Sequence, residues 1–228
     1  MEVYLWMLNT EMMSKKAWFY VLFFTGLSIA FYVVLTQIIP GYGEVRLPVL
    51  NYVKPFSFIN QDGKTMTERD TEGKVYVAEY FFTTCQGICP NLNRNLKTVF
   101  DKYRAEPAFA ILSHTSDPVN DDAERLRKYA DSLHVNHANW WFLTGEKDNL
   151  YNAARVSYLL DDPKNNLTNI EEQFLHTQYF ALVDKSGRVR KIYDGLKKDE
   201  IAELSKDIET LLRELPNHKR FVNNVFSN

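Results

Sequence analysis

The 228-residue chain has only two cysteines, a net charge of −2 and no visible internal repeat or low-complexity tract. Two cysteines allow at most one disulfide within the chain, so a fold held by several disulfides is excluded. The near balance of 27 Lys and Arg against 29 Asp and Glu gives no support for nucleic-acid binding, which normally shows a basic stripe. We therefore expect no nucleic-acid partner. The length is enough for one domain with a full core.

One long segment, residues 17–39, has no charged residue. As a helix it would be roughly 35 Å long at about 1.5 Å per residue, enough to span a bilayer core of about 30 Å. Lys15 and Lys16 precede the segment, Pro40-Gly41 follows it, and no Ala-x-Ala cleavage site comes after it. These features predict an uncleaved, single-pass membrane anchor rather than a cleaved signal peptide.

The two lysines before the anchor predict its orientation. Positive charge is retained on the cytoplasmic side, so the rest of the chain is expected on the periplasmic or extracytoplasmic side of a bacterial inner (cytoplasmic) membrane. The predicted divisions are a cytoplasmic N-terminus at 1–16, a transmembrane anchor at 17–39, a linker at 40–54, a folded domain at 55–216 and a C-terminal tail at 217–228.

The predicted domain alternates strands with amphipathic helices. Residues 75–82 form a nearly continuous apolar run, typical of a central strand buried on both faces. The other expected elements are a hairpin around the Asp-Gly turn of 55–64, strands at 109–112, 140–144, 178–184 and 189–193, and helices at 90–103, 121–133, 147–160 and 201–215. The last helix is expected to bury Ile201, Leu204, Ile208, Leu211 and Leu215 on one face. This order predicts a thioredoxin-like α/β fold, a central mixed sheet flanked by helices.

Both cysteines lie where the first central strand gives way to a helix, in the run Cys85-Gln-Gly-Ile-Cys89-Pro90. The helix dipole and unpaired N–H groups at a helix N-terminus favour a thiolate, and two adjacent thiolates repel each other. Three intervening residues, one more than in thioredoxin-type exchange, give the sulfurs more freedom. The pair is therefore predicted to bind a soft metal, to exchange electrons or to form one local disulfide.

A metal at this dithiol would need a further ligand. Soft thiolates select Cu(I) or Zn(II), but two sulfurs are an incomplete site for copper that must also be held as Cu(II). A histidine would complete it. His176 follows a polar loop that could fold over the dithiol, so from its position it is either the third ligand or an ordinary loop histidine.

The remaining candidates have plainer interpretations. His114 ends a strand near the same edge and is expected to form hydrogen bonds rather than to bind metal. His134 and His137 are expected in a solvated connector, and His218 in the exposed tail. Asp117 precedes a proline, so it is either a turn carboxylate or nearby helix cap, or a group that tunes the dithiol or meets a partner.

Together these features resemble the Sco/SenC family of copper-binding assembly proteins. The features that match are the anchor, the strand before Cys85-x-x-x-Cys89-Pro90, the loop 113–118, the Trp-x-Leu-Thr-Gly145 stretch and His176, about ninety residues after the dithiol. The family often has an acidic residue directly before this histidine, where the present chain has Leu175.

The resemblance covers residues 55–212 and implies one bound copper, Cu(I) or Cu(II), held by Cys85, Cys89 and His176. It also implies a non-enzymatic role in maturing the dinuclear copper centre of cytochrome c oxidase. The partners would be the oxidase's copper-binding subunit and a copper donor protein. On this basis we predict a membrane-anchored copper chaperone.

Other functions would use the same sulfurs. A membrane-tethered thiol–disulfide oxidoreductase needs only Cys85 and Cys89 and would reduce the cysteines of an oxidase subunit or of another exported protein. A peroxidase would need a threonine and an arginine beside its reactive cysteine; Thr84 is present, but no suitably placed arginine is evident. A purely structural disulfide would close so short a loop that it would add little stability.

Overall fold

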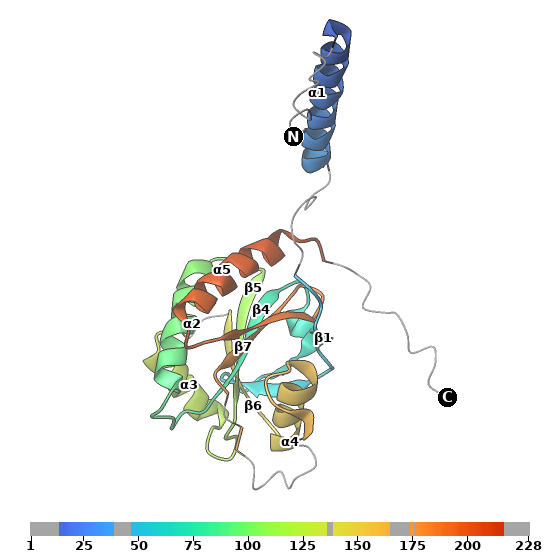
Figure 1. Cartoon of the computed structure of the whole chain (residues 1–228). Coiled ribbons are helices and arrows are strands. Elements are labelled where there is room, and N and C mark those ends of the chain that lie inside the picture. Colours follow the sequence, from blue (N-terminus) through green and yellow to red (C-terminus); the bar gives the residue numbers. More distant parts are fainter. Residues whose placement is uncertain (1–13, 39–46, 136–138, 165–173, 176, 217–228) are drawn as a thin grey trace, which may run out of the picture. The chain divides into compact units, whose positions relative to one another are not determined.

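The chain divides into two compact units in a computed structural model. The units are Met1–Arg46 and Leu47–Asn228, and the described residues are 14–38, 47–135, 139–164, 174–175 and 177–216. The first unit contains helix α1 (Lys15–Ile38), whose apolar stretch Lys15–Thr36 is long enough to cross a membrane. The predicted N-terminal apolar helix is therefore present (Figure 1).

The second unit is built on one eight-stranded mixed sheet in the order β1-β8-β7-β4-β5-β6-β2-β3. β4 pairs in parallel with β5 and β5 with β6, whereas the other neighbours pair antiparallel. The strands are β1 (Asn51–Tyr52), β2 (Ser57–Asn60), β3 (Thr65–Thr67), β4 (Val75–Phe81), β5 (Phe109–Thr115), β6 (Trp140–Thr144), β7 (Tyr179–Val183) and β8 (Arg188–Asp194). The predicted hairpin is β2–β3, and β1 comes from residues that the sequence assigned to the linker.

Helices cover both faces of this sheet. They are the short 3₁₀ helix η1 (Glu68–Thr71), α2 (Cys89–Tyr103), α3 (Ala123–Ser132), α4 (Lys147–Asn152), its π-helical continuation η2 (Ala153–Ser157) and α5 (Lys198–Arg213). α2, α3 and α5 contribute to the core on one face, and α4 with η2 to the core on the other. α2 and α5 lie side by side (Figure 1). The predicted thioredoxin-like α/β fold is confirmed by this arrangement.

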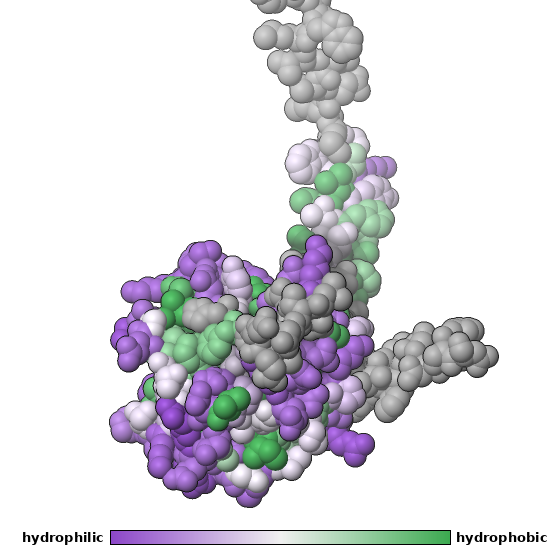
Figure 2. All heavy atoms as spheres, turned by 90° about the horizontal axis from the view of Figure 1, so that it is seen from below, coloured by the Kyte–Doolittle hydropathy of each residue, from purple (hydrophilic) through white to green (hydrophobic). Residues whose placement is uncertain are grey.

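β4 is the strand around which both cores form, because all seven of its residues are buried. Its alternating side chains enter different cores: Val77 and Phe81 pack with α2, whereas Tyr76 and Tyr80 pack with the α4 side. The surface is more polar, and Figure 2 shows apolar side chains in small patches among hydrophilic ones.

α5 ends earlier than the sequence predicts. Its inner face buries Ile201, Leu204, Ile208 and Leu211, as expected, but Leu215 lies beyond the helix and is 81% exposed. The backbone becomes extended at Glu214, whose carboxylate pairs with Arg190 at 2.9 Å. The prediction for Leu215 was therefore wrong. Pro216 follows it directly and disfavours helical backbone at the residue before it.

Arg190 joins three distant parts of the second unit. Its side chain is 3% exposed and pairs with Asp184 at 2.8 Å as well as with Glu214. Its Nε donates to the carbonyl of Leu47 at 3.0 Å. The guanidinium thus ties the first residues of the unit and the end of α5 to the β7–β8 hairpin.

We expect Arg190→Ala to lower the free energy of unfolding by about 3–5 kcal/mol, since it leaves the buried Asp184 without one of its charged partners. Urea unfolding of the full chain in detergent measures this. Arg213→Ala is the matched control, because the Arg213–Glu209 pair is exposed and worth about 0–1 kcal/mol. Equal losses in the two variants would contradict a special role for the buried cluster.

Candidate functional site

The two cysteines lie at the carboxyl end of β4, where the chain turns into α2. Cys85 is half-buried, and its N–H donates to the carbonyl of Phe82 at 3.2 Å, closing a short turn. Cys89 is the first residue of α2, 3% exposed, and packs in the core of that face. Pro90 follows in the first helical turn, where its missing N–H leaves no bond unmade. Both thiols are free and together form the predicted dithiol.

The two thiols differ in their surroundings. Burial raises the pKa of the Cys89 thiol, and the hydrogen bond and charge of Cys85 act in the same direction. A backbone hydrogen bond from Phe82 acts in the opposite direction but is a smaller effect. The helix N-terminus was expected to favour a thiolate, and for Cys89 burial outweighs it. In the metal-free dithiol, Cys89 therefore keeps its proton at neutral pH.

The residues just before His176 pack close to this loop. The ring of Phe174 meets the ring of Phe82 edge-on, with centroids 4.8 Å apart. Leu175 is buried, and its N–H donates to the hydroxyl of Tyr151 at 3.0 Å. His176 itself lies outside the described residues, so its role as a ligand stays a prediction.

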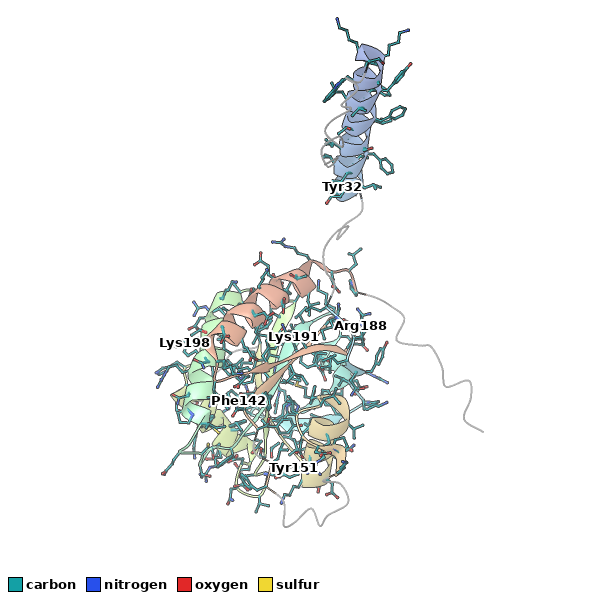
Figure 3. All side chains as sticks on the ribbon, in the orientation of Figure 1. Tyr32, Phe142, Tyr151, Arg188, Lys191 and Lys198 are labelled. Atoms are coloured by element: carbon teal, nitrogen blue, oxygen red, sulfur yellow. The ribbon has the colours of Figure 1, made fainter. Side chains whose placement is uncertain are left out.

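Tyr151, which the sequence did not single out, connects two loops. It projects from α4 in the lower part of the second unit (Figure 3). Its hydroxyl donates to the carbonyl of Ser116 at 2.8 Å and accepts from the N–H of Leu175. Because Ser116 follows β5, one side chain holds the segment that leads to His176 against the loop beyond β5.

The structure separates His114 from the dithiol. It is fully buried in β5, stacked on Tyr80 with ring centroids 4.9 Å apart, in the core on the opposite face from Cys89. Its Nδ1 lies 3.3 Å from the carbonyl oxygen of Glu79, as expected of a hydrogen-bonding histidine. Burial lowers the pKa of His114 to about 4, so the ring is neutral.

The structure describes two of the other candidates, His134 and Asp117. His134 is exposed just after α3, and His137 and His218 lie outside the described residues. Asp117 accepts a hydrogen bond from Asn120 at 2.8 Å and donates its N–H to Thr115 at 2.9 Å, as a turn carboxylate does. Among the residues that the structure describes, no three His, Cys, Asp or Glu side chains gather as metal ligands, and the third predicted ligand is not among them.

A buried carboxylate beside the dithiol loop was missed by the sequence analysis. Asp122 caps α3 by accepting from the N–H of Arg125 at 2.8 Å, which leaves the neighbouring Asp121 for another role. Asp121 accepts from Thr83, two residues before Cys85, and from Thr115 at the end of β5. The sequence signal for this residue is the pair of adjacent aspartates before α3. Only one aspartate can be the helix cap, so the other is available for a different role.

An arginine also reaches this loop. The Nε of Arg125 donates to the hydroxyl of Thr83 at 2.7 Å. No arginine was evident near the dithiol from the sequence, because α3 lies about forty residues further along the chain. The parallel pairing of β4 and β5 brings the two together.

Glu79 is the one charged residue of β4, and it is buried. It stands opposite Ser113 of β5, whose hydroxyl donates to Oε1 at 2.6 Å and accepts from the indole N–H of Trp140 at 2.9 Å. Oε2 has no hydrogen-bond partner among the described residues. Burial raises the pKa of Glu79 to about 7, and the hydrogen bond from Ser113 opposes that rise.

The raised pKa of Glu79 predicts that the stability of the folded protein depends on pH. Its folded pKa lies above its usual 4.5, so its contribution to stability is complete below about pH 4.5 and is lost as the pH rises through 7. Glu79→Gln cannot ionise, and we expect its stability relative to the parent to rise by about 3 kcal/mol between pH 5 and pH 8. Urea unfolding at intervals across this range measures the difference. Parallel pH profiles for the two proteins would show that the prediction fails.

Comparison with known proteins gives matches that span the second unit. The family model described as SCO1/SenC matches residues 47–213. The SCO1 protein homolog of Bacillus subtilis is 32% identical over 174 residues, which cover 75% of this chain and 88% of that protein.

Solved structures give the same result. A SCO1/SenC family lipoprotein from Bacillus anthracis is 28% identical, with a TM-score of 0.63 over 73% of this chain and 99% of that one. BsSco, described as a member of the Sco family of cytochrome c oxidase assembly proteins with a disulfide switch, is 30% identical. Its TM-score is 0.62, and the match covers 74% of this chain and 98% of that one. Both likenesses are in sequence as well as in fold.

Proposed function

The chain belongs to the SCO1/SenC family, and we propose that it is a membrane-anchored copper chaperone that assists assembly of the dinuclear copper centre of cytochrome c oxidase. Its relative BsSco is described as a cytochrome c oxidase assembly protein. The observation that carries the proposal is the free Cys85–Cys89 pair at the start of α2, with Phe174 packed onto the same loop.

The chemistry of the donors fits copper as cargo. Cys85 and Cys89 supply two soft sulfurs that bind Cu(I) as thiolates, and both must lose their protons for binding. His176 is the proposed third ligand, since an imidazole accommodates copper in either oxidation state. The packing of Phe174 on Phe82 supports this assignment, because the proposed ligand is two residues away in the chain.

The proposed setting follows from the anchor. We place α1 in a bacterial inner membrane and the second unit on the periplasmic or extracytoplasmic side, where disulfides form and persist. The Bacillus anthracis relative is a lipoprotein, which is consistent with a tethered domain. The copper would come from a donor protein and pass to the copper-binding subunit of the oxidase.

A thiol–disulfide oxidoreductase is the second candidate function. It is favoured by the two free thiols and by the disulfide switch described for BsSco. It needs Cys85 and Cys89 but not His176, and its substrate would be a disulfide in an oxidase subunit or another exported protein. The two functions are not exclusive, because both use the reduced Cys85–Cys89 pair. Oxidation of the pair to a disulfide would release the metal, since only thiolates bind it.

Copper titration of the full chain in detergent tests the three-ligand site. We expect His176→Ala to weaken Cu(II) binding by more than about a hundredfold, since losing even a group that supports a metal ligand costs about 10–100-fold. Cu(I) binding should fall less, because both soft sulfurs remain. His134→Ala, an exposed histidine just after α3, is the matched control and should bind both ions as the parent does.

A second assay separates the two functions. If His176→Ala binds Cu(II) as tightly as the parent, the three-ligand site is wrong. If that variant also restores oxidase assembly in a deficient strain while Cys85→Ser does not, the oxidoreductase is the better description. Loss of assembly with both variants supports the chaperone.

Tyr151 offers a further prediction. Tyr151→Phe removes the hydroxyl that links Leu175 to Ser116, so the segment before His176 loses an anchor. We expect about tenfold weaker Cu(II) binding with Cu(I) binding nearly unchanged. Tyr80→Phe also loses a buried hydroxyl, bonded to the carbonyl of Leu150 at 2.7 Å, and should leave both affinities unaltered. Equal effects of the two substitutions would contradict the assignment.

A further inference from the structure

The turn that carries Cys85 is bonded to Asp121, which is not one of the proposed copper ligands. Thr83 donates to this carboxylate twice, from its N–H to Oδ2 at 3.1 Å and from its hydroxyl to Oδ1 at 2.5 Å. Thr115 donates its hydroxyl to Oδ2 at 2.6 Å. One carboxylate, 1% exposed, therefore joins the loop after β4 to the end of β5.

Other contacts hold the same turn. The Nε of Arg125 donates to the Thr83 hydroxyl at 2.7 Å and lies 3.6 Å from Oδ1 of Asp121. The N–H of Ser116 donates to the carbonyl of Phe81 at 2.7 Å, which fixes the start of the turn. The backbone and the side chain of Thr83 are thus both held, and Cys85 follows two residues later.

Capping of α3 does not explain why the carboxylate of Asp121 is buried. Asp122 already caps the helix, so Asp121 is not needed there. A carboxylate taken out of water is costly unless donors surround it, and three hydrogen bonds surround this one. Two of the three come from the turn that carries Cys85, so the group is bonded mainly to the dithiol loop.

We propose that Asp121 is a positioning residue for the dithiol, which holds the Cys85 sulfur beside Cys89 by fixing the turn at Thr83. The inference uses the same two sulfurs as the proposed function but requires neither copper nor His176. Holding the turn in this way gives the Cys85 sulfur a high effective concentration at the Cys89 sulfur. A high effective concentration favours any product in which the two sulfurs are joined, such as a disulfide.

Disulfide formation measures that effective concentration directly. In exchange with oxidised dithiothreitol, the Cys85 and Cys89 thiols give up two electrons and two protons and form one S–S bond. The reagent's disulfide takes up both and becomes a dithiol. The equilibrium constant of this exchange falls when the two protein sulfurs are held together less well.

The experiment uses the full chain in detergent with copper removed by a chelator. For Asp121→Asn we expect the equilibrium constant for forming the Cys85–Cys89 disulfide to fall about tenfold, equivalent to about 30 mV for this two-electron couple. Thr83→Val keeps the backbone bond to Asp121 and loses the hydroxyl, so a fall of about threefold is expected. Asp122→Asn is the matched control and should match the parent, because asparagine caps a helix as well as aspartate does.

The equilibrium constant for disulfide formation separates a positioning role of Asp121 from a general role in stabilising the fold. If Asp121→Asn and Thr83→Val unfold at lower urea but keep the parent's equilibrium constant, or raise it, the proposal is overturned. If Asp121→Asn does not fold, Thr83→Val decides the question in the same assay. Copper is absent throughout this experiment. A negative copper titration therefore does not affect the disulfide result, and a negative disulfide result does not affect the copper titration.

Discussion

The parallel pairing of β4 with β5 is the constraint on which the site depends. It runs in register from Val75 opposite Phe109 to Phe81 opposite Thr115, so both strands end at the same edge of the sheet. The loop with the cysteines and the loop that leads to α3 therefore leave side by side. The bonds between Thr83 and Asp121, and between Ser116 and Phe81, follow from this arrangement.

The burial of β4 places one carboxyl group, that of Glu79, out of contact with water. Every other side chain of the strand is apolar or a tyrosine, and both cores depend on them. Glu79 interrupts the pattern and has one oxygen without a hydrogen-bond partner among the described residues. Its charge also acts on Cys89, in the same direction as burial. A local conflict of this kind, inside an otherwise consistent strand, is typical of a position with a role beyond folding.

The periodicity of the sequence was enough to predict the sheet, its helices and the position of the dithiol, because each depends on a local pattern. The apolar run at 75–82 became β4, and Pro90 marked the first turn of α2. Helical spacing alone misplaced the end of α5. Leu215 precedes Pro216, which disfavours helical backbone there, and Glu214 is already extended and pairs with Arg190 of β8.

The candidate site was predictable only in part, because some of its contacts join residues far apart in the sequence. Two cysteines before a helix are a local signal, whereas Asp121 and Tyr151 act through partners far away in the sequence. The choice between Asp121 and Asp122 as the helix cap depends on which carboxylate faces Thr83. The face of the sheet on which His114 lies also needed the structure, because a strand buried on both faces has no polar side to mark its orientation.

The unequal exposure of the two sulfurs bears on both proposed functions. Cys89 is 3% exposed and begins α2, whereas Cys85 lies half-buried in the turn before it. A partner that exchanges copper or a disulfide must therefore meet Cys85 first. Cys89 can then take part only through its neighbour, so the transfer depends on how well the turn at Thr83 keeps Cys85 in place. Asp121, which fixes that turn, would therefore affect the transfer at Cys85 both for copper and for a disulfide.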